Sequence, residues 1–178
     1  MDKSQIMILD PTKFMFEDLP LICLSSHANN PIAWLIRLRT NSSYNHAMWL
    51  WRPGHFASQG LVFEDVPLQS YLRPKTKLKF WRIKNMTGAQ KVNINDRIVK
   101  RINLPWWRRR YDFLGVLGQA VGLKFLNNPF TSYCSEVIAA DLSSIFSRIP
   151  KHPSPEDLDT WFKAHPDLFE YVGHVLID

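Results

Sequence analysis

Two strand-like runs, residues 44–51 and 55–62, are separated only by Arg52-Pro53-Gly54. Proline holds φ near the value that the first central turn position needs, and glycine supplies the positive φ of the second. A turn of this kind brings the two runs back against each other. The sequence therefore predicts an antiparallel β-hairpin, although a Pro-Gly pair does not by itself fix the register of the two strands.

Elsewhere the chain mixes strand-like and helix-like patterns. Charged and apolar residues alternate from Lys77 to Lys84, as in a strand with one face in water. Further strands are predicted at residues 19–25 and 171–177, helices at 32–39, 95–103, 134–146 and 156–163, and a helical turn at 67–72. Because these elements lack the regular βαβ order of a parallel sheet, the predicted fold class is α+β, with an antiparallel sheet packed against helices.

The composition limits the class of protein. The chain has 178 residues, of which 46% are hydrophobic and 13% aromatic, and this is enough for a single domain over residues 1–178 with a sizeable core. No apolar run approaches the roughly 20 residues that cross a bilayer, and residues 1–10 do not resemble a signal peptide. A cytoplasmic, monomeric protein is expected, with a phage-encoded enzyme as an alternative origin.

Cys134 is the candidate nucleophile. It lies at the start of a predicted helix, with Thr131 or Ser132 as the cap. The free N–H groups and the positive dipole end of a helix favour the thiolate and lower its pKa, and they can also bind an oxyanion. The alternative is a small buried core residue, since free cysteine is among the most buried residue types. The chain has only one other cysteine, Cys23, so neither a disulfide framework nor a metal site is expected.

His46 is the candidate proton acceptor, because a thiol nucleophile usually works with a histidine. It lies in the first strand of the hairpin, and the small Ala47 leaves space beside the ring. The other histidines are expected to be structural or solvated; they are His27, His55, His152, His165 and His174.

The second strand of the hairpin should supply the side chain that orients the His46 ring. With a two-residue turn Gln59 is the diagonal neighbour of His46, and with a three-residue turn Ser58 takes that place. Gln59 is the preferred candidate because its amide has the longer reach; Ser58 is the second choice and His55 the third. A neutral side chain stabilises an imidazolium less than a carboxylate does, so a weak thiolate–imidazolium pair is expected.

Four segments of the chain resemble a known family in content and order. They are residues 40–51, Tyr111-Asp112, Tyr133-Cys134-Ser135-Glu136-Val137 and Ser154-Pro155-Glu156-Asp157-Leu158. This order is similar to that of the circularly permuted NlpC-type papain-like cysteine hydrolases, the YiiX-like group, over roughly residues 18–178. Asn45 and Val137 depart from the family pattern, but neither change removes a catalytic group.

The resemblance implies an activity and roles for the site residues. Cys134 would be the nucleophile, His46 the general base and Tyr111 part of the cleft, with no cofactor. Relatives are bacterial or phage amidases and peptidases that act mostly on cell-wall peptides, so these are the expected substrates. Some members of the wider superfamily transfer acyl groups of lipids, which is the second enzymatic expectation.

A basic, aromatic segment points to a different class of function. The net charge is +6, and the main concentration of cations is Lys100-Arg101 followed by Trp106-Trp107-Arg108-Arg109-Arg110. Such a segment can bind an anionic polymer or a membrane surface, and a non-catalytic module that does so is the alternative to an enzyme. No nucleic-acid-binding motif frames the segment. The simpler interpretation is a basic loop that covers an apolar edge of the core.

Overall fold

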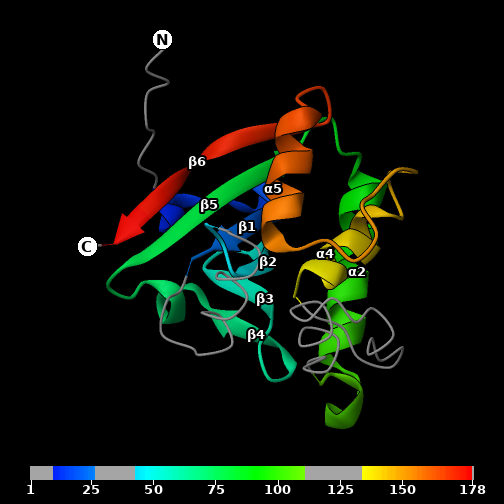
Figure 1. Ribbon diagram of the computed structural model, residues 1–178. Coiled ribbons are helices and arrows are strands. Elements are labelled where there is room, and N and C mark those ends of the chain that lie inside the picture. Colours follow the sequence, from blue (N-terminus) through cyan, green and yellow to red (C-terminus); the bar gives the residue numbers. More distant parts are fainter. Residues whose placement is uncertain (1–9, 27–42, 111–133, 178) are drawn as a thin grey trace.

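The computed structural model describes residues 10–26, 43–110 and 134–177. Six strands form one antiparallel sheet in the order β4-β3-β2-β1-β5-β6. The strands are β1 (Leu21–Ser25), β2 (His46–Arg52), β3 (His55–Gln59), β4 (Phe63–Pro67), β5 (Thr76–Ile83) and β6 (Phe169–Ile177). Helices α2 (Gly88–Ile102), α4 (Cys134–Leu142) and α5 (Pro155–Ala164) pack against this sheet (Figure 1). The predicted α+β class, with an antiparallel sheet packed against helices, is confirmed.

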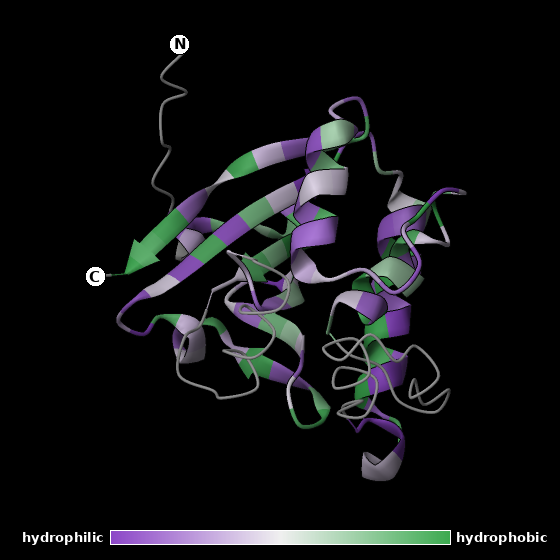
Figure 2. Cartoon of the chain, viewed as in Figure 1, coloured by the Kyte–Doolittle hydropathy of each residue, from purple (hydrophilic) through white to green (hydrophobic). Residues whose placement is uncertain are grey.

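The sheet buries apolar side chains on both of its faces. On the helical face, sheet residues such as Trp49 and Ala57 pack against α2, α4 and α5. On the other face, Met48 and Phe56 belong to a second core that includes Leu68 from the short helix η3 (Leu68–Tyr71). Hydrophilic residues separate hydrophobic ones along much of β5 (Figure 2). Leu78 and Phe80 belong to the second core, whereas Trp81 and Ile83 belong to the core on the helical face. The register shift between Phe80 and Trp81 marks the point where the apolar side chains change faces.

Two helices begin at capping boxes. At α5 the Ser154 hydroxyl accepts from the N–H of Asp157 at 3.1 Å, and Pro155 takes the first helical position. This start agrees closely with the sequence prediction. At α2 the Thr87 hydroxyl accepts from the N–H of Gln90 at 3.2 Å. The predicted start of α2 near residue 95 is therefore wrong, because this box begins the helix at Gly88.

The hairpin of β2 and β3 contains a β-bulge. Arg52 pairs with His55 across a two-residue turn, in which Gly54 has φ of 69°, whereas Leu50 pairs with Phe56. Trp51 is thus an extra residue on β2. Every pair beyond it shifts by one position, so Met48 faces Ser58. This shift decides which residue of β3 reaches His46.

The edge strand β4 is not among the strands predicted from the sequence. It pairs with β3 from His55–Pro67 to Gln59–Phe63. Two acidic residues and a terminal proline give this segment a low strand propensity, and both features are common on edge strands. Within the described ranges, no helix is both long and apolar enough to cross a bilayer. The helix predicted at residues 32–39 lies outside the described residues.

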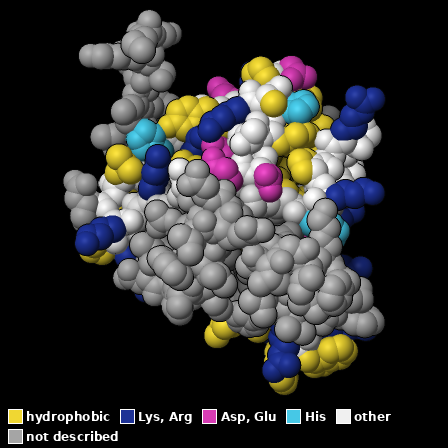
Figure 3. Space-filling view, viewed as in Figure 1, with side chains coloured by type: hydrophobic (Ala, Val, Ile, Leu, Met, Phe, Trp, Pro, Cys, Tyr) yellow, Lys and Arg dark blue, Asp and Glu magenta, His cyan; other side chains and the backbone are white. Residues whose placement is uncertain are grey.

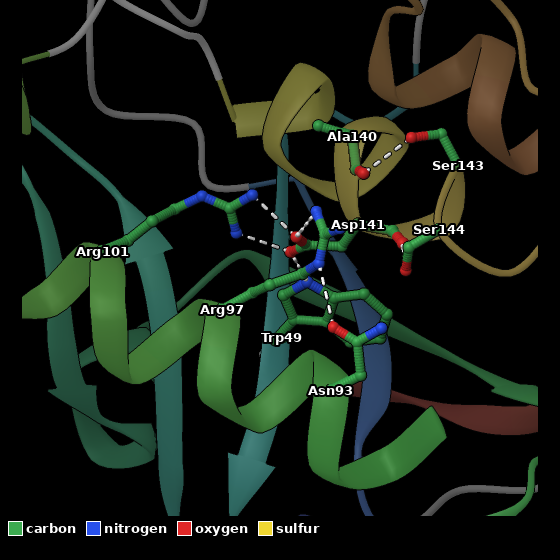
Figure 4. Close-up of polar contacts among 8 residues, drawn as sticks. All are labelled: Trp49, Asn93, Arg97, Arg101, Ala140, Asp141, Ser143 and Ser144. Atoms are coloured by element: carbon green, nitrogen blue, oxygen red, sulfur yellow. Dashed lines mark hydrogen bonds and ion pairs between the residues drawn. The ribbon is translucent and has the colours of Figure 1, made fainter. Parts of the chain in front are cut away.

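A buried carboxylate fixes α4 to its neighbours. Asp141 is fully buried and accepts two hydrogen bonds from the Arg101 guanidinium of α2, each at 2.7 Å. It also accepts from the indole N–H of Trp49 on β2 at 3.0 Å, while Arg97 lies 4.0 Å away (Figure 4). Because one side chain joins a helix, a second helix and the central part of the sheet, it sets where the first residue of α4 lies.

Candidate active site

Cys134 is the first residue of α4, and its side chain is buried at 3% exposure. Backbone N–H groups of Ala47, Ser135 and Cys134 itself interact with the sulfur. Burial nevertheless outweighs these groups and raises the pKa of the Cys134 thiol to about 11. The expectation of a lowered pKa is therefore wrong. The cost of desolvating a thiolate is larger than the stabilisation that the N–H groups at the helix start give it. The caps expected for this helix, Thr131 and Ser132, lie outside the described residues.

His46 is the first residue of β2 and is half-buried. Its Nε2 atom lies 2.8 Å from the hydroxyl oxygen of Ser58, which is 1% exposed. The amide of Gln59 points elsewhere and donates to the carbonyl of Arg109 at 2.8 Å. Of the residues considered from the sequence, Ser58, the second choice, is thus hydrogen-bonded to the His46 ring, and the preferred Gln59 is not. The physical reason is the bulge at Trp51, which moves the register by one residue although the turn itself is tight.

Tyr71 belongs to the same cluster and was not predicted from the sequence. Its hydroxyl lies 2.6 Å from Ser58 Oγ and 3.3 Å from His46 Nε2. Its ring is stacked on the His46 ring, with centroids 6.0 Å apart and planes 5° apart. Burial raises the pKa of Tyr71 to about 12, so the phenol stays neutral. The predicted helical turn at residues 67–72 is present as η3, but no motif marks Tyr71 within it.

The structure brings Cys134 to the same end of the sheet as His46. The sulfur of Cys134 interacts with the N–H of Ala47, the residue that follows His46. Ionisation of Cys134 would raise the pKa of Tyr71, which touches the His46 ring, so the sulfur and the phenol lie within electrostatic range of each other. The cluster Cys134–His46–Ser58–Tyr71 therefore combines a thiol, an imidazole and two hydroxyls. Tyr111, the expected cleft residue, lies outside the described residues.

The fold of this chain has a counterpart among solved structures. An antiparallel sheet carries helices on one face, and Cys134 begins the helix that packs on β2 near the middle of the sheet. Among solved structures, the metalloprotein yiiX from Escherichia coli O157:H7 is similar to this chain, with a TM-score of 0.53 and 12% identity. The match covers 89% of this chain and 87% of that one. It is a likeness of fold. No protein-family model and no curated protein matches the chain.

Because yiiX is a metalloprotein, the donor groups of this chain bear on whether it could hold a metal ion. Among the described residues, no three His, Cys, Asp or Glu side chains lie together in a way that could hold a metal ion. The Cys134–His46–Ser58–Tyr71 cluster offers one imidazole and one thiol, with neutral hydroxyls as the remaining groups. Structural and catalytic zinc sites use at least three protein ligands. The described residues do not fit a metal centre, and no chemical step below involves one.

The raised pKa of Cys134 predicts how the thiol responds to pH. Only the thiolate reacts with iodoacetamide. The rate of Cys134 alkylation should rise about tenfold per pH unit through the neutral range and level off only near pH 11. Peptide mass spectrometry separates this reaction from that of Cys23, whose pKa burial raises well above its ordinary value. A rate that is already level at mildly acidic pH would show a preformed thiolate and contradict the prediction.

Proposed function

We propose that this chain is a thiol-dependent hydrolase of amide or ester bonds, in which Cys134 is the nucleophile and His46 the general base. The observation that carries the proposal is the Cys134–His46–Ser58–Tyr71 cluster. A buried thiol at a helix start lies against the strand that begins with His46, and the ring of His46 is held at Nε2 by Ser58. The motif order in the sequence, similar to that of permuted NlpC-type hydrolases, supports the same assignment.

The reaction begins with a neutral thiol. With Nε2–H donating to Ser58 Oγ, the lone pair of His46 Nδ1 is the proton acceptor. Nδ1 takes the proton from Cys134 as the sulfur attacks the substrate carbonyl, and a carbon–sulfur bond forms. The backbone N–H groups of Cys134 and Ser135, next to the sulfur, receive the negative charge on the carbonyl oxygen. The imidazolium then gives its proton to the amine or alcohol, which leaves as the thioester forms.

Water completes the cycle. His46 takes a proton from water, whose oxygen attacks the thioester carbonyl. The carbon–sulfur bond breaks, the proton returns to the sulfur, and a carboxylic acid is released. Proton transfer and carbon–sulfur bond formation occur together, because a thiol with a pKa of about 11 holds little thiolate near neutral pH.

Ser58 and Tyr71 act as positioning residues in this scheme. Ser58 can accept from His46 Nε2–H while donating its own proton to the Tyr71 oxygen. This arrangement fixes the tautomer and the angle of the ring. Both groups are neutral, so they stabilise the imidazolium less than a carboxylate would, which is in keeping with a thiol that is protonated at rest.

Replacing Ser58 with Ala should lower kcat about tenfold with little change in KM, because one hydrogen bond to the base is lost. Tyr71→Phe should have a smaller effect, and the double variant should lose less than the product of the two, since both side chains act on one ring. Gln59→Ala is the matched control from the same strand. Its amide touches Arg109 rather than His46, so its kcat should remain within about twofold of the wild-type value. Equal losses in Ser58→Ala and Gln59→Ala would contradict the assignment.

Trapping of the covalent intermediate tests the proposed function. The protein is mixed with a p-nitrophenyl ester, the reaction is quenched in acid, and the mass of the protein is measured by mass spectrometry. An acyl adduct on Cys134, absent from Cys134→Ala, is expected, and a peptide p-nitroanilide tests the amide substrates that the sequence resemblance favours. An unmodified Cys134 together with unchanged hydrolysis in Cys134→Ala would overturn the proposal and favour a non-catalytic binding module.

A further inference from the structure

An exposed patch of apolar and cationic side chains lies beyond the end of β3. Leu61 is 74% exposed, and in the short helix η4 (Trp106–Arg108) Trp106 is 57% and Trp107 55% exposed. Together with Arg108 and Arg110, these residues are called the Trp–Arg patch. Hydrophobic and basic side chains lie side by side at the lower right edge of the molecule, where residues 106–110 are found (Figures 1 and 3).

Backbone contacts hold the two halves of the patch together. Val62 forms a β-bridge with Arg110, and the N–H of Phe63 donates to the carbonyl of Arg109 at 2.8 Å. The guanidinium of Arg109 donates to the carbonyl of Phe63 at 3.2 Å. The turn that carries Leu61 therefore lies beside the segment that carries the two tryptophans.

The cations of the patch lie on its aromatic rings. The guanidinium of Arg110 is 4.5 Å from the centroid of the Trp106 ring, and that of Arg108 is 5.0 Å from the Trp107 ring. Within the part of the chain that the structure describes, neither arginine forms an ion pair with a carboxylate. The patch thus combines exposed apolar surface with exposed positive charge.

We infer that the Trp–Arg patch docks this protein on an anionic lipid surface. Tryptophan rings lie readily at the level of lipid headgroups, arginines pair with headgroup phosphates, and an aliphatic side chain such as Leu61 can enter the acyl boundary. A nucleic acid fits less well. One face of each tryptophan ring is already covered by a guanidinium, and Leu61 has no aromatic face on which a base could stack.

The patch is close to the catalytic cluster along the chain. Ser58, which holds the His46 ring, precedes Leu61 by three residues, and Gln59 hydrogen-bonds to the carbonyl of Arg109 within the basic segment. Docking through the patch would bring this end of the sheet to the lipid surface. The docking proposal itself does not depend on the chemistry proposed for Cys134.

Co-sedimentation with vesicles tests the docking. The protein should bind vesicles of mixed phosphatidylcholine and phosphatidylserine more tightly than vesicles of phosphatidylcholine alone, and added salt should weaken the binding. Arg108→Gln with Arg110→Gln should weaken it roughly 10- to 30-fold. Trp106→Ala with Trp107→Ala should weaken it by at least about tenfold, and Leu61→Ser by a smaller factor.

Two matched controls distinguish binding through the patch from a general effect of positive charge or of exposed apolar surface. Arg73→Gln with Lys151→Gln removes two exposed positive charges elsewhere, and Leu176→Ala removes a side chain that is 51% exposed on β6. Both should bind the mixed vesicles within about twofold of wild type. Absence of vesicle binding, or equal losses in patch and control variants, would overturn the inference. Binding to single-stranded DNA that persists in the Leu61 and tryptophan variants, without binding to vesicles, would overturn it in favour of a nucleic acid.

Discussion

Replacing Cys134 with Ala should reduce the hydrolysis of an activated ester or peptide amide by roughly a thousandfold or more. In the proposed reaction the sulfur forms the thioester, and Ala offers no nucleophile in its place. His46→Ala should cause a loss of similar size, because a buried thiol with a pKa of about 11 needs a base to remove its proton. The double variant should lose little more than either single variant, since the two side chains act in one step.

Cys23→Ala is the matched control for this measurement. Cys23 is also a fully buried thiol, but it lies within β1 in the core on the other face of the sheet. Its removal should leave kcat/KM within about threefold of wild type, and thermal unfolding shows whether each variant is folded. Steady-state kinetics in which folded Cys134→Ala retains activity would contradict the role given to Cys134.

The second large effect is a loss of stability, expected when Asp141 is replaced. Asp141→Ala removes the carboxylate that accepts two hydrogen bonds from Arg101 and one from Trp49 (Figure 4). Since this leaves a largely buried guanidinium without its counter-ion, the free energy of unfolding should fall by about 3–5 kcal/mol. Urea denaturation followed by circular dichroism measures the change.

Glu170→Gln provides the comparison for Asp141. Glu170 also pairs with an arginine, Arg82 at 3.3 Å, but both side chains are partly exposed. Its loss should cost less than about 0.5 kcal/mol. If Asp141→Ala cost no more than Glu170→Gln, the buried ion pair would not be what holds α4 on the sheet.

Most of the secondary structure follows from local patterns. The alternation in residues 77–84 gives β5, and the cap at Ser154 gives α5, because each depends on neighbouring residues alone. The start of α2 at Gly88 could also have been predicted from the sequence, since Thr87 and Gln90 have the spacing of a capping box. The strand β4 could not be predicted from local patterns, because residues 63–67 are extended through pairing with β3 and not through their own composition.

The candidate site was predictable only in part, because its details depend on tertiary structure. The sequence singled out Cys134 and His46, which the fold brings to one end of the sheet. The choice between Gln59 and Ser58 depended on a bulge at Trp51, and no local pattern marks that extra residue. Tyr71 reaches the His46 ring from a different element, and the pKa of Cys134 depends on how much of the fold covers it.

A crystal structure with a thiol-directed inhibitor bound to Cys134 tests the central claim most directly. The modified sulfur should lie about 3–4 Å from His46 Nδ1, while Nε2 keeps its contact with Ser58. A His46 ring turned away from Cys134, with its Nδ1 on the far face of the sheet and no approach to the sulfur, would contradict it.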